Sequence, residues 1–215
     1  MANIINPITV AISGASGTIY GLRILQFLLE NNYKVDFVIS ESASKVAKEE
    51  INFELSINPK LLKEQILSYF NKNVNSILLN VWAHDDISAS ISSGSYRSLG
   101  MIIAPASMGT IAAISCGTSD NLITRAADVC LKERKKLVLL PREMPFSSIH
   151  LENLLKLSTA GAIIAPACPG FYHNPQKLTD LIDFVAGKVL DLFGIEHSLF
   201  KRWKKEESIN LKVLQ

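Results

Sequence analysis

The sequence is poor in net charge of either sign and in cysteine, and each shortage excludes a class of protein. Its 215 residues carry 22 Lys and Arg against 20 Asp and Glu, a formal net charge of +2. This balance creates no broad electrostatic field, so we expect neither a nucleic acid nor a membrane as partner. Three cysteines without a Cys-x-x-Cys pair argue against a disulfide framework. We expect reduced thiols of a cytoplasmic protein, lying mostly in the core.

The sequence also shows neither the pattern of a leader peptide nor that of a membrane-spanning segment. The start, MANIINPITV, has neither a positively charged segment nor a cleavage site, so we expect no signal peptide. Two uncharged stretches, residues 98–119 and 157–172, are long, but both are interrupted by Gly and Pro. We therefore expect buried strands followed by turns at these places.

Motifs of several common chemistries are absent as well. There is no HExxH zinc motif, no GxSxG of a serine hydrolase, no GxxxxGK[ST] phosphate loop and no DDxxD that would hold Mg²⁺. Ser16 stands where a GxGxxG fingerprint needs glycine, and the second predicted strand ends at Ser40 instead of an acid. We therefore expect neither a metal site nor a dinucleotide.

Short apolar runs alternate with helical patterns along the chain. This alternation is typical of a doubly wound parallel sheet of the Rossmann-like (flavodoxin-like) type, in three α/β/α layers. No linker divides residues 1–195, which we expect to form a single domain. We expect the charged tail, residues 196–215, to pack on a neighbouring subunit. Strands are predicted at Thr9–Ser13, Lys34–Ile39, Ile77–Val81, Met101–Ala104, Lys136–Leu140 and Ala162–Ala165, and helices at Thr18–Asn31, Ala43–Ile51, Lys60–Asn71, Met108–Ser115, Asn121–Lys135, Leu151–Thr159 and Lys177–Phe193.

Two segments nearly repeat each other: GMIIAPAS, residues 100–107, and GAIIAPAC, residues 161–168. We interpret them as two central strands that leave the sheet through a proline. The ends of parallel strands rim the ligand crevice in sheets of this kind. We therefore expect one cleft faced by the segments at Gly14, Ser40, Pro105, Pro141 and Pro166.

The turn Gly14-Ala15-Ser16-Gly17 joins the first strand to the first helix. Backbone N–H groups and the positive end of the helix dipole point at one spot there, which suits a phosphate. Ser40 and the turn over residues 104–110 repeat the pattern of small hydroxyl residues. Three such turns predict a mononucleotide cleft with an apolar ring pocket, which would suit a flavin. The alternative is that Ser16 and Ser40 are only turn and capping residues.

Charged residues gather between positions 121 and 153. Arg125 and Lys132 are seven residues apart and share a helix face, and Arg142-Glu143 follows the strand LVLLP. An arginine and a glutamate at a cleft mouth can bind a phosphate and move a proton. The alternatives are a solvated helix end for Lys132 and an ordinary surface loop for Arg142-Glu143.

Two later residues could join Arg142 around a second phosphate. Tyr172 lies in the segment PGFYHNP, and Lys188 lies inside an amphipathic helix. Taken alone, Tyr172 is equally compatible with a packed aromatic residue and Lys188 with a solvated one.

Together these residues resemble the flavin prenyltransferase family, the UbiX/Pad1-type proteins. The resemblance covers most of residues 8–195, and its longest segment is residues 120–157, from DNLITRAADVC to LENLLKL. It implies an enzyme that binds reduced FMN and dimethylallyl monophosphate and joins the prenyl group to N5 and C6 of the flavin. The product would be passed to a UbiD-type decarboxylase. The other matching segments are residues 14–17 with Tyr20-Gly21, Ser40, Ser93-Gly94-Ser95, residues 105–110 and residues 169–175.

The resemblance implies a role for each matching position. Residues 1–195 would be an FMN-binding flavoprotein domain, with Glu143 as the acid–base residue. Ser16 and Glu50 would also be catalytic, and Glu50 would reach the site from a neighbouring subunit. The FMN contacts would be Gly14, Ala15, Ser16, Ser40, Ser107, Met108, Gly109, Thr110 and Arg142. The prenyl phosphate would be held by Lys132, Arg125, Arg142, Tyr172 and Lys188, with Trp203 covering the site.

Two positions depart from the family pattern. Lys188 stands where many relatives carry Arg, and Ile87 stands where some bacterial members carry Trp. Without that Trp the pocket has one π face fewer to stabilise an allylic cation, so the preferred prenyl chain stays open. A metal ion is not required, because Lys, Arg and Tyr can handle a monophosphate leaving group and the flavin itself is the nucleophile.

Three other functions compete with prenyl transfer. A cysteine-conjugate decarboxylase of this fold would need a histidine in the first helix, but none precedes His84. An FMN carrier without chemistry would share the FMN residues but would have no use for Glu143, Lys132 and Tyr172. A direct aromatic-acid decarboxylase is not excluded by the residues.

The sequence and the resemblance both favour self-association. A mean hydropathy of +0.22 with 20% charged residues predicts apolar surface that needs covering. The family forms trimers joined into dodecamers, so we expect a homo-oligomer, a dodecamer, with sites at subunit interfaces.

Overall fold

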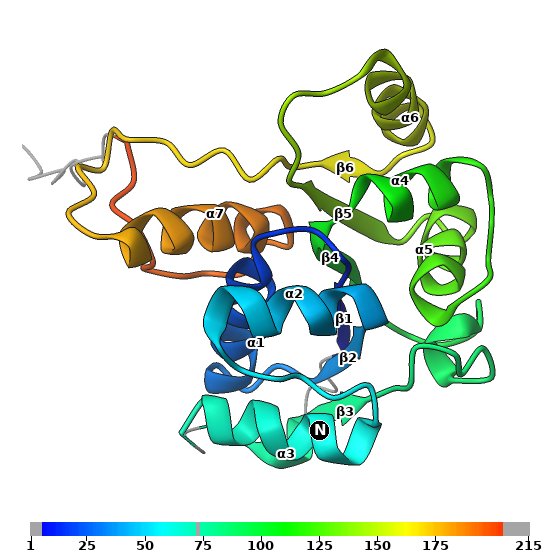
Figure 1. Cartoon of the computed structure of the whole chain (residues 1–215), viewed down its shortest axis with the longest axis horizontal. Helices are drawn as coiled ribbons and strands as arrows, with labels where there is room; N and C mark the ends of the chain where they lie inside the picture. Colours follow the sequence, from blue (N-terminus) through cyan, green and yellow to red (C-terminus); the bar gives the residue numbers. More distant parts are fainter. Residues whose placement is uncertain (1–5, 72–73, 204–215) are drawn as a thin grey trace, which may run out of the picture.

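Over residues 6–71 and 74–203, which the computed structural model describes, six parallel strands form one sheet between two layers of helices (Figure 1). The strand order is β3-β2-β1-β4-β5-β6, so the chain winds outward from β1 to one edge and then from β4 to the other. The switch point lies between β1 and β4, where sheets of this class bind ligands. The strands are β1 (Ile8–Ile12), β2 (Val35–Ile39), β3 (Leu79–Val81), β4 (Gly100–Ala106), β5 (Lys136–Pro141) and β6 (Ile163–Ile164).

Alternating strand residues feed two hydrophobic cores. Ile8, Val10 and Ile12 of β1 face the helices α1, α2, α3 and α7, whereas Ala11 faces α4, α5 and α6. This period of two is the expected consequence of a pleated strand that is covered on both faces. The helices are α1 (Thr18–Glu30), α2 (Glu41–Ile51), α3 (Pro59–Tyr69), α4 (Met108–Ser115), α5 (Leu122–Lys132), α6 (Ser148–Thr159) and α7 (Leu178–Leu192).

The predicted fold class is confirmed, and each predicted strand and helix exists within a few residues of its expected bounds. Helices α2 and α6 begin earlier than predicted because Ser40 and Ser147 cap them. The interpretation of residues 161–168 as a central strand is wrong. Strand β6 has two residues and stands at the edge of the sheet, since β5 is its only described partner.

The expectation that the cysteines lie mostly in the core is corrected by the structure. Cys130 is buried, but Cys116 and Cys168 are exposed, because the first ends α4 and the second follows β6 in a loop. In the first part of the tail, Phe200 is buried in the core beside α7 of its own chain, and the packing of the tail on a neighbouring subunit stays a prediction. The rest of the tail, residues 204–215, lies outside the described residues. Among the helices described, none has the length and apolar character needed to cross a membrane.

Candidate functional site

Ser13 joins the two strands at the switch point. Its hydroxyl donates to the carbonyl oxygen of Pro105 at 3.1 Å and accepts from the N–H of Ser107 at 2.8 Å. The residue is almost fully buried, so these bonds are shielded from water. The ends of β1 and β4, and the turns that follow them, are thereby held in a fixed relation.

The turn over residues 14–17 requires glycine at both ends. A β-carbon on Gly14 would lie 2.4 Å from the β-carbon of Ser42, and Gly17 has a φ of +106°. The first contact brings the start of α2 against the turn that follows β1, and the second is a left-handed conformation that favours glycine. The glycines therefore allow α2 to pack closely over the turn between β1 and α1.

An anion does occupy the N-terminus of α1, and it is a side chain of this chain. The N–H of Gly17 donates to both carboxylate oxygens of Glu50 at 2.9 Å, and the N–H of Thr18 donates to one of them at 3.0 Å. The expectation that Glu50 arrives from a neighbouring subunit thus differs from the structure. The last turn of α2 lies over the start of α1, so the carboxylate reaches its own chain's turn.

Glu50 is held as a carboxylate. Partial burial by itself would raise the pKa of Glu50, but hydrogen bonds from the Ser16 side chain and from the Gly17 and Thr18 N–H groups outweigh it, and the pKa lies below its ordinary value. At neutral pH the group can accept a proton or a hydrogen bond but has no proton to give. The Ser16 hydroxyl and the Glu50 carboxylate therefore lie together at this turn, within one chain.

Arg142 reaches the same turn from β5. Its Nε donates to the carbonyl oxygen of Ser16 at 3.0 Å. A cavity of about 520 Å³ lies beside this contact, which is within the usual size for small-molecule sites. The cavity combines a guanidinium, a carboxylate and apolar walls: Ser16, Gly17, Ile19, Tyr20, Glu50, Ile51, Arg142, Ala167, Leu178 and Ile182 line it.

Several wall residues of this cavity had no chemical signal in the sequence. Ala167 belongs to the second near-repeat, whereas Leu178 and Ile182 are ordinary apolar positions of α7. Only the packing of α7 against α1 brings them to the turn. Tyr20, which the family segments include, is also a wall residue, and burial raises the pKa of its phenol, with a smaller contribution from Cys168.

Ser40 and Ser107 are capping residues at the neighbouring turns. The Ser40 hydroxyl accepts from the N–H of Ala43 at 3.1 Å, and the Ser107 hydroxyl accepts from the N–H of Thr110 at 3.2 Å. Ser40 therefore caps α2, and its hydroxyl still has a proton to donate. The Ser107 hydroxyl also lies 3.0 Å from Oγ1 of Thr110, where either group can be the donor. Gly109, in the first turn of α4, has nothing within 4 Å of the place of a β-carbon, so this turn can be approached closely.

Glu143 follows Arg142 at the exit of β5 and is exposed. Its described hydrogen bond is local, because one carboxylate oxygen accepts from the N–H of Met144 at 3.1 Å. Glu143 follows the lining residue Arg142 in the sequence, but its own side chain does not line the cavity.

Lys188 lies on α7, Tyr172 packs on the same helix through Phe184, and Trp203 packs against Tyr172. The ring of Tyr172 packs edge-on against Trp203 at 5.4 Å and against Phe184 of α7 at 5.5 Å, between ring centroids. Lys188 lies one turn further along and pairs with Asp191 at 3.9 Å. Tyr172 is thus a packed aromatic residue, but 46% of it remains exposed.

The two basic residues of α5 form local ion pairs. Arg125 pairs with Asp128 at 3.1 Å, and Lys132 pairs with Glu133 at 2.6 Å. Helix α5 runs back to the amino end of the sheet, where Lys132 Nζ lies beside Gly94. Within one chain the structure does not bring Lys132 to Arg142.

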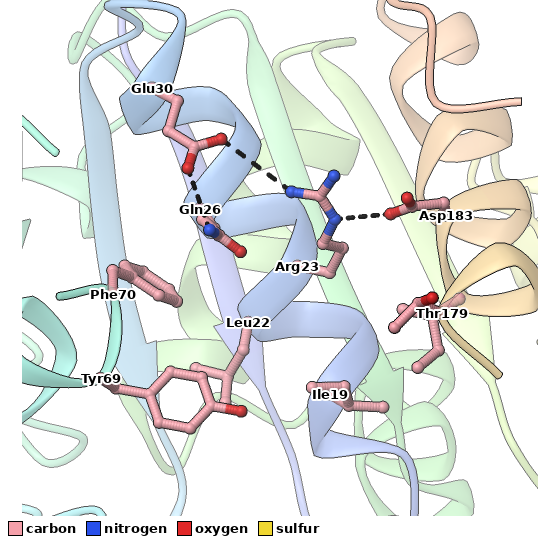
Figure 2. Close-up of a pocket in the computed structure, with 10 residues that line it drawn as sticks. Ile19, Leu22, Arg23, Gln26, Glu30, Tyr69, Phe70, Thr179 and Asp183 are labelled. Carbon is pink, nitrogen blue, oxygen red and sulfur yellow. Dashed lines mark hydrogen bonds and ion pairs between the residues drawn. The ribbon is translucent and has the colours of Figure 1, made fainter. Parts of the chain in front are cut away.

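A second groove, of about 460 Å³, lies between α1, the end of α3 and α7 (Figure 2). Arg23 crosses it to Asp183 at 2.5 Å and lies 4.0 Å from Glu30. It shares Ile19 and Ile182 with the cavity but contains no residue that the sequence predicted for the site. Within residues 6–71 and 74–203, no three His, Cys, Asp or Glu side chains are grouped to hold a metal ion.

Comparisons with known proteins agree with this geometry. The Flavoprotein family profile matches residues 2–190. Flavin prenyltransferase UbiX of Alkalihalophilus pseudofirmus is 49% identical over 197 residues, which cover 91% of this chain and 94% of the relative. Flavin prenyltransferase UbiX of Pseudomonas aeruginosa is 45% identical over 203 residues, covering 94% of this chain and 96% of the relative.

Solved structures extend the match to three dimensions. AnUbiX (PadA1), described as a complex with FMN and dimethylallyl pyrophosphate, superposes with a TM-score of 0.82 at 39% identity, covering 94% of this chain and all of that one. A dodecameric FMN-dependent UbiX-like decarboxylase from Escherichia coli O157:H7 gives a TM-score of 0.80 at 38% identity, covering 93% of this chain and all of that one. The chain therefore belongs to the flavin prenyltransferase UbiX family of flavoproteins.

Proposed function

We propose that this protein is a flavin prenyltransferase that joins a dimethylallyl group from dimethylallyl monophosphate to N5 and C6 of reduced FMN. The observation that carries the proposal is the meeting of Arg142, Ser16 and Glu50 on one glycine turn, beside a cavity of about 520 Å³. The apolar walls suit a flat ring, the guanidinium suits a phosphate, and the carboxylate suits a proton relay. FMN supplies the nucleophilic ring atoms, and the residues of this chain fit it.

Each residue has a distinct part in this proposal. The hydroxyls of Ser40 and Ser107 and the open turn at Gly109 would contact FMN, while Arg142 would hold a phosphate oxygen. Ser16, whose hydroxyl proton points to the Glu50 carboxylate, would accept a hydrogen bond from the flavin. Glu143 would take the proton that C6 must lose and pass one to the departing phosphate. Tyr172 and Lys188 would hold the prenyl phosphate.

One assay decides the function. Purified protein is mixed anaerobically with reduced FMN and dimethylallyl monophosphate, with EDTA present, and the flavin product is analysed by mass spectrometry. We expect a singly prenylated flavin, unchanged by EDTA, because Lys and Arg neutralise the leaving phosphate and Tyr donates a hydrogen bond to it. Loss of turnover with EDTA and recovery with Mg²⁺ would contradict the metal-independent reaction. The same assay with dimethylallyl diphosphate in place of the monophosphate shows which of the two prenyl donors the protein uses.

A second candidate is direct decarboxylation of an aromatic acid. Two similar solved structures are described as decarboxylases: the Escherichia coli protein above, and a phenylacrylic acid decarboxylase from Aquifex aeolicus. The same purified protein is therefore given an aromatic acrylic acid, and release of CO₂ would favour decarboxylation. We expect none, because the prenylated product is made for a separate UbiD-type decarboxylase.

We further propose a cytoplasmic homo-oligomer, a dodecamer, in which a second copy completes the site. Exposed apolar residues on and before α6 support self-association: Met144 is 89% exposed, Leu155 68% and Ile149 66%. The separation of Lys132 from Arg142 within one chain supports a contribution from a neighbouring copy.

Mixing two inactive variants tests the shared site. Lys132→Ala and Arg142→Ala should each lose prenyl transfer, since each removes a cation from the phosphate site. When the two are refolded together, some sites draw Lys132 from one copy and Arg142 from another, so we expect up to about a quarter of wild-type activity to return. A mixture that stays as inactive as its parts would mean that both residues serve the same chain's site.

A further inference from the structure

Residues 195–203 are folded tightly onto α7. Phe200 is buried, and the side chain of His197 is fully shielded from solvent. A β-carbon on Gly187 would lie 2.5 Å from the His197 ring and 2.7 Å from the Phe200 ring. The segment can lie this close only because α7 has a glycine at the point of contact.

A single carboxylate, that of Asp191 on α7, fastens the segment. It accepts two hydrogen bonds from the guanidinium of Arg202, at 2.7 and 3.1 Å, and contacts His197 Nε2 at 3.1 Å. The two residues come from opposite ends of the segment, so one side chain holds it at two points. Partial burial raises the pKa of Asp191, but Arg202, His197 and Lys188 outweigh it and keep the pKa below its ordinary value.

The segment carries Trp203 to the face of α7 that holds Tyr172 and Lys188. Trp203 packs edge-on against Tyr172, and Asp191 also lies 3.9 Å from the ammonium of Lys188. Asp191 therefore contacts Lys188 directly, and it is linked to Trp203 through Arg202 and to Tyr172 through Trp203. It is not among the walls of the 520 Å³ cavity.

We infer that Asp191 is a positioning residue for the prenyl donor: it fixes residues 195–203 on α7 and so sets Trp203 against Tyr172 and Lys188. This rests on the proposed role of Tyr172, Lys188 and Trp203 in prenyl transfer. A bidentate arginine–carboxylate pair fixes direction as well as distance, which suits a residue that must orient a segment.

The chain offers a matched control on the same helix. Asp183 pairs with Arg23 of α1 (Figure 2) but makes no described hydrogen bond or ion pair to residues 195–203. Asp191→Ala and Asp183→Ala each remove one paired carboxylate from α7 and introduce alanine, the residue with the highest helix propensity. Only the first is expected to release the segment.

Two readouts separate positioning from general damage. Hydrogen–deuterium exchange of the peptide 195–203, without any substrate, should be at least about tenfold faster in Asp191→Ala and unchanged in Asp183→Ala. The KM for dimethylallyl monophosphate should rise about tenfold with kcat changed less than about threefold, because binding in the ground state is lost. In a Trp203→Ala background, Asp191→Ala should raise KM little further, since both act through one side chain.

Two more variants test whether residues 195–203 are held on α7 in the way that we infer. Asp191→Glu should restore most of the protection, and Gly187→Ala should release the segment while favouring the helix. Unchanged exchange of the peptide 195–203 in both Asp191→Ala and Gly187→Ala would overturn the inference. It would also be overturned if the rise in KM of the double variant Asp191→Ala/Trp203→Ala equalled the product of the rises in the two single variants. A wild-type protein without prenyl transfer would instead contradict the proposed function, and the exchange measurement would still show whether Asp191 holds the segment.

Discussion

Replacing Glu143 by glutamine should lower prenyl transfer by at least about a hundredfold while FMN binding and the fold are retained. Bond formation at C6 of the flavin requires that C6 lose its proton, and the departing phosphate gains from receiving one. Glu143 follows Arg142 at the exit of β5 and is exposed, with only the local N–H of Met144 as described hydrogen-bond donor. Glutamine keeps the shape of the side chain and removes its basicity.

The measurement is single-turnover absorbance of reduced flavin mixed anaerobically with dimethylallyl monophosphate. Glu64→Gln is the matched control, because Glu64 is an exposed glutamate on α3, away from the turn and the cavity. Its rate should equal that of the wild type. A wild-type rate for Glu143→Gln would mean that Glu143 is a surface residue and that another group, with Glu50 the nearest described carboxylate at the turn, moves the proton.

The fold could be predicted from local patterns because the local signals and the packing agree. The helix predicted at Met108–Ser115 has the bounds observed for α4, since a serine caps its start. Where prediction failed, the missing information was nonlocal. The second near-repeat has the composition of a central strand, but β5 lies between it and the sheet centre, so it pairs on one side only.

Without the family resemblance, the site was predictable only where sequence neighbours are also neighbours in space. The glycines of residues 14–17 predict the turn, and the position of Arg142 at the end of β5 predicts that it lies at the same edge of the sheet. The seven-residue spacing placed Arg125 and Lys132 on one helix face but could not tell that α5 carries Lys132 to the amino end of the sheet. The Glu50 carboxylate reaches Gly17 across 33 positions, through the packing of α2 over α1, for which no local pattern exists.

Replacing Gly21 by alanine should be strongly destabilising, by about 3 kcal/mol, because no space exists for one methyl group. Gly21 is buried in α1, and its β-carbon would lie 2.1 Å from the carbonyl oxygen of Ala104 and 2.7 Å from Cγ1 of Ile12. Ala104 belongs to β4 in the middle of the sheet, so its carbonyl cannot move away cheaply. Helix α1 must lift from β1 and β4 instead, which exposes core surface.

The control is Gly109→Ala in α4, where nothing lies within 4 Å of the new methyl group. Removing a glycine from a helix there should stabilise the apo protein by about 0.5–1 kcal/mol, so the two variants are expected to differ in sign. Thermal unfolding of both proteins checks this, and a Gly21→Ala melting temperature equal to that of the wild type would contradict the close packing of α1 on β4.

The Gly21→Ala substitution should also affect the site, because α1 begins at Thr18, next to the turn that Arg142 and Glu50 hold. At temperatures where the variant is still folded, its affinity for FMN should therefore fall as well, since a lifted α1 carries Ser16 and Gly17 away from Arg142.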